Sequence, residues 1–337
     1  YGPLMRAAIA TASNDHRLGA NEAPPAIMSV YLGTQLEEVF EQIKTGTVSE
    51  SKQKGVLDIG VDVVPQLTQD AGDRNRTSPF AFTGNRFEFR AVGSNQSVSG
   101  PLIVLNTMLA DSLDWIGNRL KNELAKDTEM NTAIITVLKD VMEQHSAVIF
   151  GGNGYSEEWH KMAVEERGLV NLPTSADALP VLKEETIEDL FKKTGVLTPV
   201  ELESRFEVYA EQYILSIEVE AKLMVNMAKT MIYPAAMEYL SQLSNTLNNL
   251  AHFSIALEQD HIQKIANLTN SLVADMTRLS DALAKNHAAN TEEKMRYCAS
   301  TLLPIMRELR EKADALEGEV ADGLWPLPTY QEMLFIK

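Results

Sequence analysis

The chain has 337 residues and a formal net charge of −17 at pH 7, with 45% hydrophobic and 23% charged residues. This is the composition of a globular protein with a packed core, and it excludes an intrinsically disordered chain. The acidic balance also excludes a protein that binds nucleic-acid phosphates, because such proteins concentrate Lys and Arg.

Cysteine usage and hydropathy narrow the class further. The single cysteine, Cys298, rules out a disulfide framework and lacks the Cys or His partners of a zinc site, which indicates a reducing, cytoplasmic setting. No run of about 18 apolar residues occurs, so we expect no transmembrane helix and no membrane partner. Because the sequence starts at Tyr1 with neither Met nor a secretory leader, we expect it to be part of a longer polypeptide.

Positive charge is concentrated in arginines near the amino end. Residues 1–100 hold 9 Lys and Arg against 11 Asp and Glu, whereas the remainder holds 21 against 36. Six of those nine cations are arginines, and four of them lie between positions 74 and 90. The planar donors of arginine suit carboxylate and phosphate oxygens, so the cluster indicates an anion-binding site. A solvated surface with ion pairs is the alternative interpretation.

Turn formers are frequent in the first part of the chain. Asn14, Asp15 and residues 19–25 are expected in loops, because Gly, Asn and a pair of prolines interrupt a helix. Apolar residues at helical spacing then predict a helix over 27–43, and a polar loop should follow over 45–56.

A strand is predicted next. The segment NRFEFR, residues 85–90, alternates charged and phenylalanine side chains at its end. Since successive side chains of a strand point to opposite faces, Arg86, Glu88 and Arg90 would share one face and the phenylalanines the other. Taken alone, this charged face also fits an ion-paired edge strand, so both interpretations stay open.

Helices dominate from residue 99 onward. Ser99 is a candidate cap, Pro101 suits a first turn, and apolar residues then recur every three or four positions as far as Leu124. A second helix is predicted over 132–144. Residues 150–182 contain a GGNG run and two prolines, and we expect them to form loops.

Beyond residue 184 almost the whole chain is predicted to be helical. Pro234 and Pro304 should end or kink helices. Long apolar stripes favour an antiparallel helical bundle or hairpin. They offer more apolar surface than a monomer of this size buries, and an oligomer interface would cover the excess. The stripes cover residues 206–231, 240–250, 265–283 and 302–316.

Three motifs in a fixed order point to a family. HRLGANEAPP occupies residues 16–25, DRNRTS residues 73–78 and NRFEFR residues 85–90, and a long helix follows. Together they resemble the carboxyl-terminal half of a glutamine synthetase catalytic domain. FTGNRFEFRAVG at 82–93 and LWPLP at 324–328, with NEAPP inside the first motif, are similar to the large type III branch in particular. The resemblance runs over the whole chain.

The resemblance implies ATP-dependent amidation of glutamate. Glutamate would attack the γ-phosphate of ATP to give γ-glutamyl phosphate and ADP, and ammonia would then displace the phosphate to give glutamine. ATP, glutamate and ammonium are the implied substrates. Mg²⁺, with Mn²⁺ as an alternative, is the implied metal ion.

The resemblance also implies roles for individual residues. Glu22, Arg76 and Arg90 are the implied catalytic residues. Glu22 would lie on a flap that covers the glutamate and helps to bind ammonium, and Arg76 would stabilise the transferring phosphoryl group. Arg90 would contact the reacting carboxylate or the phosphoryl oxygens. The implied binding residues are Arg17 and Arg90 for glutamate, Arg76 and Arg86 for the ATP phosphates, and Glu88 for the metal.

These residue types suit the chemistry independently of the family. Phosphoryl transfer concentrates negative charge on oxygens, and cations aimed at that charge lower the barrier. A hard Mg²⁺ ion prefers carboxylate oxygens, which Glu88 would supply between two arginines. A loop bounded by Gly19 and Pro24 suits a flap that excludes water from an acyl phosphate.

We therefore predict an α+β chain in two parts. Residues 1–183 would be the carboxyl-terminal part of a glutamine synthetase catalytic domain, with an incomplete β-sheet or barrel. Residues 184–337 would be a mainly helical region with long antiparallel helices.

Much of the family's active site has no counterpart in this sequence. Its other metal ligands, its ammonium-activating aspartate and its small β domain are missing, so we expect the 337 residues alone to be inactive. Family members share active sites between subunits, and the type III branch implies a homo-oligomer of two stacked hexameric rings, a dodecamer. The alternative function is a non-catalytic helical module for oligomerisation.

Overall fold

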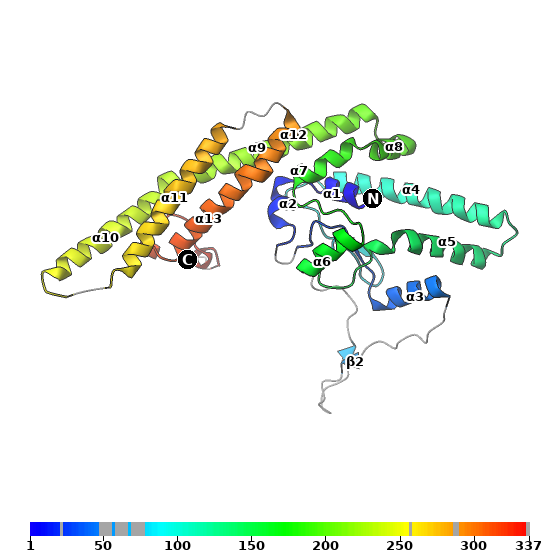
Figure 1. The fold of residues 1–337 in the computed structure, drawn as a ribbon, viewed down its shortest axis with the longest axis horizontal. Helices are drawn as coiled ribbons and strands as arrows, with labels where there is room; N and C mark the ends of the chain where they lie inside the picture. The colour runs from blue at the N-terminus through cyan, green and yellow to red at the C-terminus, as the bar shows by residue number, and fades with distance from the viewer. Residues whose placement is uncertain are drawn as a thin grey trace. The chain divides into compact units, whose positions relative to one another are not determined.

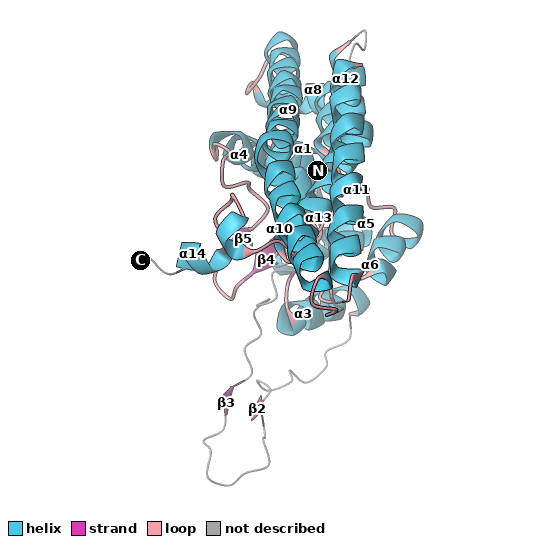
Figure 2. Cartoon of the chain, turned by 90° about the vertical axis from the view of Figure 1, so that its left-hand side faces the viewer, coloured by secondary structure: helices cyan, strands magenta, loops and turns pink. Residues whose placement is uncertain are grey.

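The chain folds into two compact units that are mostly helical (Figure 2). Unit 1 is Tyr1–Tyr209 and unit 2 is Ala210–Lys337. The predicted boundary after residue 183 divides the catalytic-domain part from the helical region that the resemblance implies, which is a different division from that into compact units. It stays a prediction. The computed structural model describes residues 1–20, 23–46, 56–57, 67–68, 78–255, 258–285 and 290–334.

Unit 1 begins with two short helices, α1 (Gly2–Ala8) and α2 (Ala12–Arg17). The Thr11 side chain caps α2 by accepting a hydrogen bond from the backbone N–H of Asn14 at 3.3 Å. Asn14 and Asp15 are therefore helical, and the prediction that they lie in a loop was wrong. A cap of this kind offsets the low helix propensity of Asn and Asp.

The predicted helix over 27–43 starts later than expected. Residues 30–31 form strand β1 (Val30–Tyr31), and the helix α3 (Thr34–Thr45) begins only after Gly33. Gly33 has a φ of +81°, a backbone conformation that favours glycine and separates strand from helix. Most of the loop predicted for 45–56 lies outside the described residues.

A small sheet holds the strand predicted near residue 88. Its order is β1, β4 (Phe80–Phe82) and β5 (Phe87–Phe89), with β1 parallel to β4 and β4 antiparallel to β5. A separate antiparallel pair joins β2 (Val56–Leu57) and β3 (Leu67–Thr68). A complete barrel is not seen among the described residues, which form this three-stranded sheet and the separate pair of strands.

Two long helices follow the sheet, as predicted. They are α4 (Ser99–Leu124) and α5 (Met130–His145), and they pack against each other. The buried face of α4 includes Val104 and Thr107, whereas Leu109 and Leu113 of the predicted stripe are 57% and 58% exposed. The leucine stripe of α4 is thus largely a surface of unit 1.

The region expected to be loops contains short helical segments. Trp159 on one of them is 1% exposed, and Ser156 and Thr174 cap two of the helices. Segments this short carry too few periodic residues to show in the sequence. They are α6 (Glu157–Lys161), η2 (Met162–Glu166), α7 (Ser175–Ala178) and η3 (Leu179–Lys183), preceded by η1 (Ser146–Val148) and followed by α8 (Glu185–Thr194).

Unit 2 is built from long helices lying side by side (Figure 1). Helix α11 packs against both α10 and α13. The predicted stripes supply its core: Leu272 and Leu279 of α11 and Leu309 and Leu316 of α13 are buried. The helices are α9 (Pro199–Met227), of which residues 210–227 belong to unit 2, α10 (Tyr233–Ala251), α11 (Asp260–Ala284), α12 (Thr291–Tyr297), α13 (Leu303–Glu317), the short η6 (Asp322–Leu324) and α14 (Tyr330–Leu334).

The predicted interruptions at Pro234 and Pro304 take the form of π turns. A proline inside a helix lacks the N–H donor, and its ring clashes with the carbonyl four residues earlier. Here a wider turn, η4 (Ala228–Ile232) or η5 (Cys298–Leu302), precedes each proline, and the next helix then continues. No helix in the described ranges combines the length and hydropathy that crossing a bilayer would require.

Candidate functional site

The candidate site is built on the hairpin of β4 and β5. Ala81 of β4 lies opposite Glu88 of β5 and is fully buried. The connecting turn is closed by a hydrogen bond from the Thr83 N–H to the Arg86 carbonyl at 2.9 Å, and Gly84 adopts a φ of +95° within it. The tight turn fixes the register and therefore the side of the hairpin to which the charged side chains point.

Glu88 lies between two arginines. Arg86 donates from Nε and Nη2 to Glu88 Oε1 at 3.2 and 3.1 Å, and Arg90 donates from Nε to Glu88 Oε2 at 3.2 Å. The predicted common face is thus present. Hydrogen bonds from Arg86 and then Arg90 hold the pKa of Glu88 below its ordinary value, so the carboxylate stays charged at neutral pH.

Exposure differs along this face. The side chains of Arg86, Glu88 and Arg90 are 71%, 34% and 17% exposed, so Arg90 is the most enclosed of the three. The phenylalanines occupy the other face, as predicted. Phe87 stacks on Phe80 with ring centroids 5.2 Å apart, and Phe89 packs against Phe80 at 6.1 Å.

Arg17, the residue predicted to bind glutamate, lies at the end of the same strand. Its Nη2 donates to the Arg90 carbonyl at 3.0 Å, and its Nη1 donates to the Ala91 carbonyl at 3.3 Å. The last residue of α2 is thereby joined to the backbone beside Arg90. The structure brings together Arg17, Arg86, Glu88 and Arg90, four of the six residues singled out in the sequence.

Glu22 and Arg76, the other two predicted site residues, lie outside the described residues. Described residues on either side of Glu22 are joined, because the Gly19 N–H donates to the Pro24 carbonyl at 2.9 Å. Gly19 has a φ of +81°, which suits the start of a tight loop. The roles of Glu22 and Arg76 stay predictions.

The described part of the site has three arginine side chains against one glutamate. This excess of cations, with planar donors, suits an anionic ligand that carries carboxylate or phosphate oxygens. Glu88 is of the right chemistry for Mg²⁺, but both of its oxygens accept hydrogen bonds from arginine. No three acidic, His or Cys residues gather within the described ranges, so these residues alone do not make up a metal site.

Sequence reasoning missed the residues that hold α2 in place. Asn14 is fully buried, and its side-chain amide donates to the backbone carbonyls of Ile9 and Ala91. Asp15 is paired with the buried Arg6. The available signal was Thr11 as a cap followed by a polar run without Gly or Pro over 12–17.

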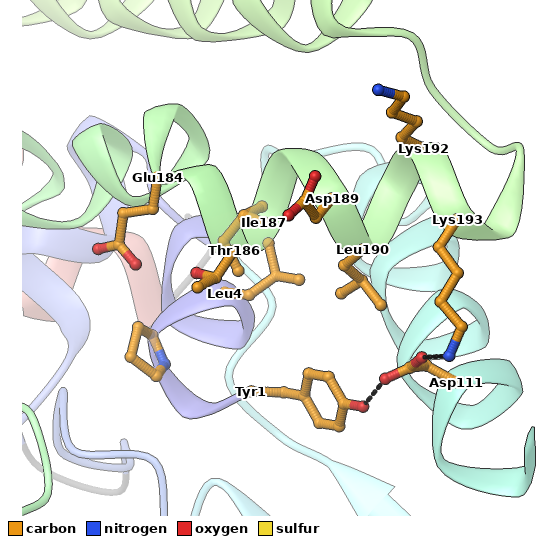
Figure 3. Close-up of a pocket in the computed structure, with 11 residues that line it drawn as sticks. Tyr1, Leu4, Asp111, Glu184, Thr186, Ile187, Asp189, Leu190, Lys192 and Lys193 are labelled. Atoms are coloured by element: carbon orange, nitrogen blue, oxygen red, sulfur yellow. Dashed lines mark hydrogen bonds and ion pairs between the residues drawn. The ribbon is translucent and has the colours of Figure 1, made fainter. Parts of the chain in front are cut away.

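Two surface cavities lie in unit 1, and Phe80 of β4 lines the second of them. One, of about 720 Å³, is formed by α1, α4 and α8, and the other has about 490 Å³. In the first, Asp111 accepts hydrogen bonds from the Tyr1 hydroxyl and from Lys193, and these lower the pKa of Asp111, Lys193 having the larger effect (Figure 3). Of the predicted site residues that the structure describes, Arg17, Arg86, Glu88 and Arg90, none lines either cavity.

Comparison with known proteins identifies one domain of this chain. Residues 133–251 match the family described as the glutamine synthetase C-terminal domain. That match covers α5 to α10 and does not include the arginine and glutamate cluster. Over these residues the chain carries the glutamine synthetase C-terminal domain.

The chain is also similar to glutamine synthetases over its whole length. The chain is 39% identical to a type-3 glutamine synthetase of Dictyostelium discoideum, over 100% of this chain and 47% of that protein. It is 35% identical to a glutamine synthetase of Bacteroides fragilis, over 99% of this chain and 47% of that protein. A glutamine synthetase of Butyrivibrio fibrisolvens is 33% identical over 99% of this chain and 48% of its own length. The chain thus spans about half the length of these relatives.

Proposed function

We propose that this chain forms part of an ATP-dependent ligase that joins glutamate and ammonia. The observation that carries the proposal is the convergence of Arg86 and Arg90 on Glu88, with Arg17 bonded to the backbone beside them. Similarity to proteins named glutamine synthetase supports it. Because the chain spans about half the length of those relatives, the activity is proposed for the complete polypeptide.

The proposed reaction has two steps. A γ-carboxylate oxygen of glutamate attacks the γ-phosphorus of ATP, the bond from that phosphorus to the bridging oxygen breaks, and ADP leaves with the electron pair. Ammonia then attacks the acyl carbon, the bond to the phosphate oxygen breaks, and phosphate leaves while the nitrogen loses one proton. Both steps move negative charge between oxygens, which arginine donors stabilise.

Each described residue has a role in this proposal. Arg90, the most enclosed of the three on its face, would contact the carboxylate and the phosphoryl oxygens. Arg86, at the exposed turn, would reach the ATP phosphates. Arg17 would bind a glutamate carboxylate with donor capacity that its bonds to the Arg90 and Ala91 carbonyls leave. Glu22 and Arg76 are proposed as catalytic on the family resemblance.

We also propose Glu88 as one ligand of Mg²⁺ or Mn²⁺. Its lowered pKa keeps it anionic, as a metal ligand must be. Bound there, the ion would neutralise charge on the ATP phosphates. Since the described residues do not complete a metal site, the 337-residue chain by itself is proposed to be inactive, with the catalytic sheet or barrel and the metal site completed by further residues.

Assembly and location follow the same resemblance. We propose a homo-oligomer of stacked hexameric rings, a dodecamer, in the cytoplasm. The exposed leucines of α4, such as Leu109 and Leu113, are the kind of surface that an assembly covers. The one cysteine, Cys298, is fully buried, and a chain with a single cysteine suits a reducing compartment.

The test measures phosphate release from ATP with glutamate, ammonium and magnesium. The complete polypeptide should turn over, and the 337-residue chain should not. Turnover at an equal rate by the isolated chain would reject the partial-site proposal.

A second measurement separates an enzyme from a non-catalytic assembly module. Binding of methionine sulfoximine, a glutamyl-phosphate analogue, with ATP should be lost in Arg90→Ala and Glu88→Ala while assembly is retained. Arg119→Ala, which removes an exposed arginine paired with Asp140, is the matched control. Unchanged binding in the Arg90 and Glu88 variants would leave only the assembly function.

A further inference from the structure

We propose that Asn14 is a positioning residue that sets Arg17 against the strand end carrying Arg90. The proposal rests on the proposed function, in which these two arginines contact glutamate. Asn14 itself touches no substrate in this scheme. It acts through the guanidinium of Arg17 and the backbone at Ala91.

Asn14 is completely buried, with all of its polar atoms in use. Its Nδ2 donates to the Ile9 carbonyl at 2.8 Å and to the Ala91 carbonyl at 3.0 Å. Its Oδ1 accepts from Arg17 Nη1 at 3.4 Å. Two carbonyls accept only, and a guanidinium donates only, so this orientation of the amide is the one that its surroundings permit.

The three groups close a triangle. Arg17 Nη1 reaches both Asn14 Oδ1 and the Ala91 carbonyl, and the Asn14 amide reaches the same carbonyl. Arg17 Nη2 then bonds to the Arg90 carbonyl at 3.0 Å. A shift of Asn14 would therefore move the Arg17 head and the end of the strand relative to each other, the two parts that the proposed glutamate site must keep in register.

The space around Asn14 is closely fitted. A Cβ atom at Gly93 would lie 3.2 Å from Asn14 Oδ1, so the backbone there passes close to the amide. An aspartate of the same size would lose the donor and place a charge against two carbonyls. An alanine would leave both carbonyls without this donor and would free Arg17 Nη1 from one acceptor.

Asn14 bonds to the Arg17 guanidinium, whereas its neighbour Asp15 has other partners. The Asp15 carboxylate faces Arg6 and accepts two hydrogen bonds from Ser175, so it anchors α2 to α1 and to the start of α7. Thr11 caps the same helix, where its hydroxyl accepts a hydrogen bond from the Asn14 backbone N–H. These neighbours allow the stability of α2 to be separated from the placement of Arg17.

The experiment uses Asn14→Ala and Asn14→Asp in the complete polypeptide, with Thr11→Ala as the matched control on the same helix. The KM for glutamate should rise about tenfold or more in the Asn14 variants, the factor expected when a hydrogen bond to a charged group is lost. The KM for ATP should stay near the wild-type value. Thr11→Ala should leave both KM values unchanged, even if it lowers the melting temperature as much as the Asn14 variants do.

A second readout does not depend on turnover. Phenylglyoxal modification of Arg17, followed by mass spectrometry of the 337-residue chain, should be faster in Asn14→Ala and unchanged in Thr11→Ala. Should Asn14→Ala fail to fold, Asn14→Ser keeps one donor and gives the same comparison with a smaller change in volume.

The outcomes distinguish the two proposals. An inactive wild-type polypeptide that binds no glutamate analogue would reject the proposed function. An active wild type with the same glutamate KM in the Asn14 variants as in Thr11→Ala would reject the positioning role alone. Equal Arg17 modification rates in Asn14→Ala and Thr11→Ala would also overturn the positioning role.

Discussion

The guanidinium of Arg6 lies 3.5 Å from the Asp15 carboxylate, and the two side chains are only 1% and 2% exposed. Arg6 also donates to the Leu172 and Pro173 carbonyls, and Ser175 donates to Asp15 at 2.7 and 2.8 Å. The pair thus joins α1, α2 and the start of α7. Since α2 carries Arg17, this buried ion pair helps to fix the position of one residue of the candidate site.

Arg6→Met should strongly destabilise unit 1. It leaves the Asp15 carboxylate buried without its cation, and breaking a buried pair in this way costs about 3–5 kcal/mol. Urea unfolding followed by tryptophan fluorescence measures the loss. The control is Arg310→Met, which breaks an exposed pair with Asp314 and should cost about 0–1 kcal/mol. Equal losses in the two variants would contradict the importance of burial here.

Glu88 should titrate below its ordinary pKa of 4.5, because hydrogen bonds from Arg86 and Arg90 favour its charged form. The folded pKa lies below the unfolded one, so the stabilising contribution is present above the unfolded pKa and is lost as pH falls through the folded pKa. A ¹³C NMR titration of side-chain carboxyls measures the shift, with Glu88→Gln to assign the resonance. A normal midpoint that Arg86→Ala and Arg90→Ala do not change would contradict this prediction.

Arg90 and Arg86 should differ in their effect on activity. Arg90 is 17% exposed and Arg86 71% exposed, so Arg90 acts where less water screens its charge. In the complete polypeptide Arg90→Ala should lower kcat/KM about 100-fold or more, as removal of a transition-state donor does. Arg86→Ala should have a smaller effect, mainly on the KM for ATP. A larger loss in Arg86→Ala would reverse the assigned roles.

The core of unit 2 can be tested with two leucines. Leu272 of α11 is fully buried, whereas Leu215 of α9 is 63% exposed. Leu272→Ala should lower the free energy of unfolding by about 2–5 kcal/mol through lost burial and the cavity left behind. Leu215→Ala should change it by less than about 0.5 kcal/mol, as surface substitutions do. Chemical denaturation followed by circular dichroism compares the two variants.

Local patterns predicted the long elements and the charged face of the hairpin. The helices from Ser99 and from Met130 have enough turns for their periodicity to show, and the alternation over 86–90 is a direct consequence of strand geometry. The stripe from Leu302 to Leu316 is buried at each of the positions that defined it.

The remaining features depend on contacts between distant residues. Val30 becomes a strand because it pairs with Phe80, fifty positions away, and the apolar residues before it suit a helix equally well. Asn14 looks like a turn former until Ala91 and Arg17 are placed beside it. The outward side of the α4 leucines likewise depends on which neighbours α4 has, which its own sequence does not contain.

The π turns before Pro234 and Pro304 each contain one residue more than an α-helical turn needs. A helix advances by about 100° per residue, so a single extra residue absorbed in a bulge lets the helix on either side keep its apolar face toward the same neighbour. Removing one residue from 228–232 together with Pro234→Ala, or one from 298–302 together with Pro304→Ala, would then restore a regular ladder with little rotation downstream. Unit 2 therefore has two places where the chain can lose one residue while the same side chains stay packed in its core.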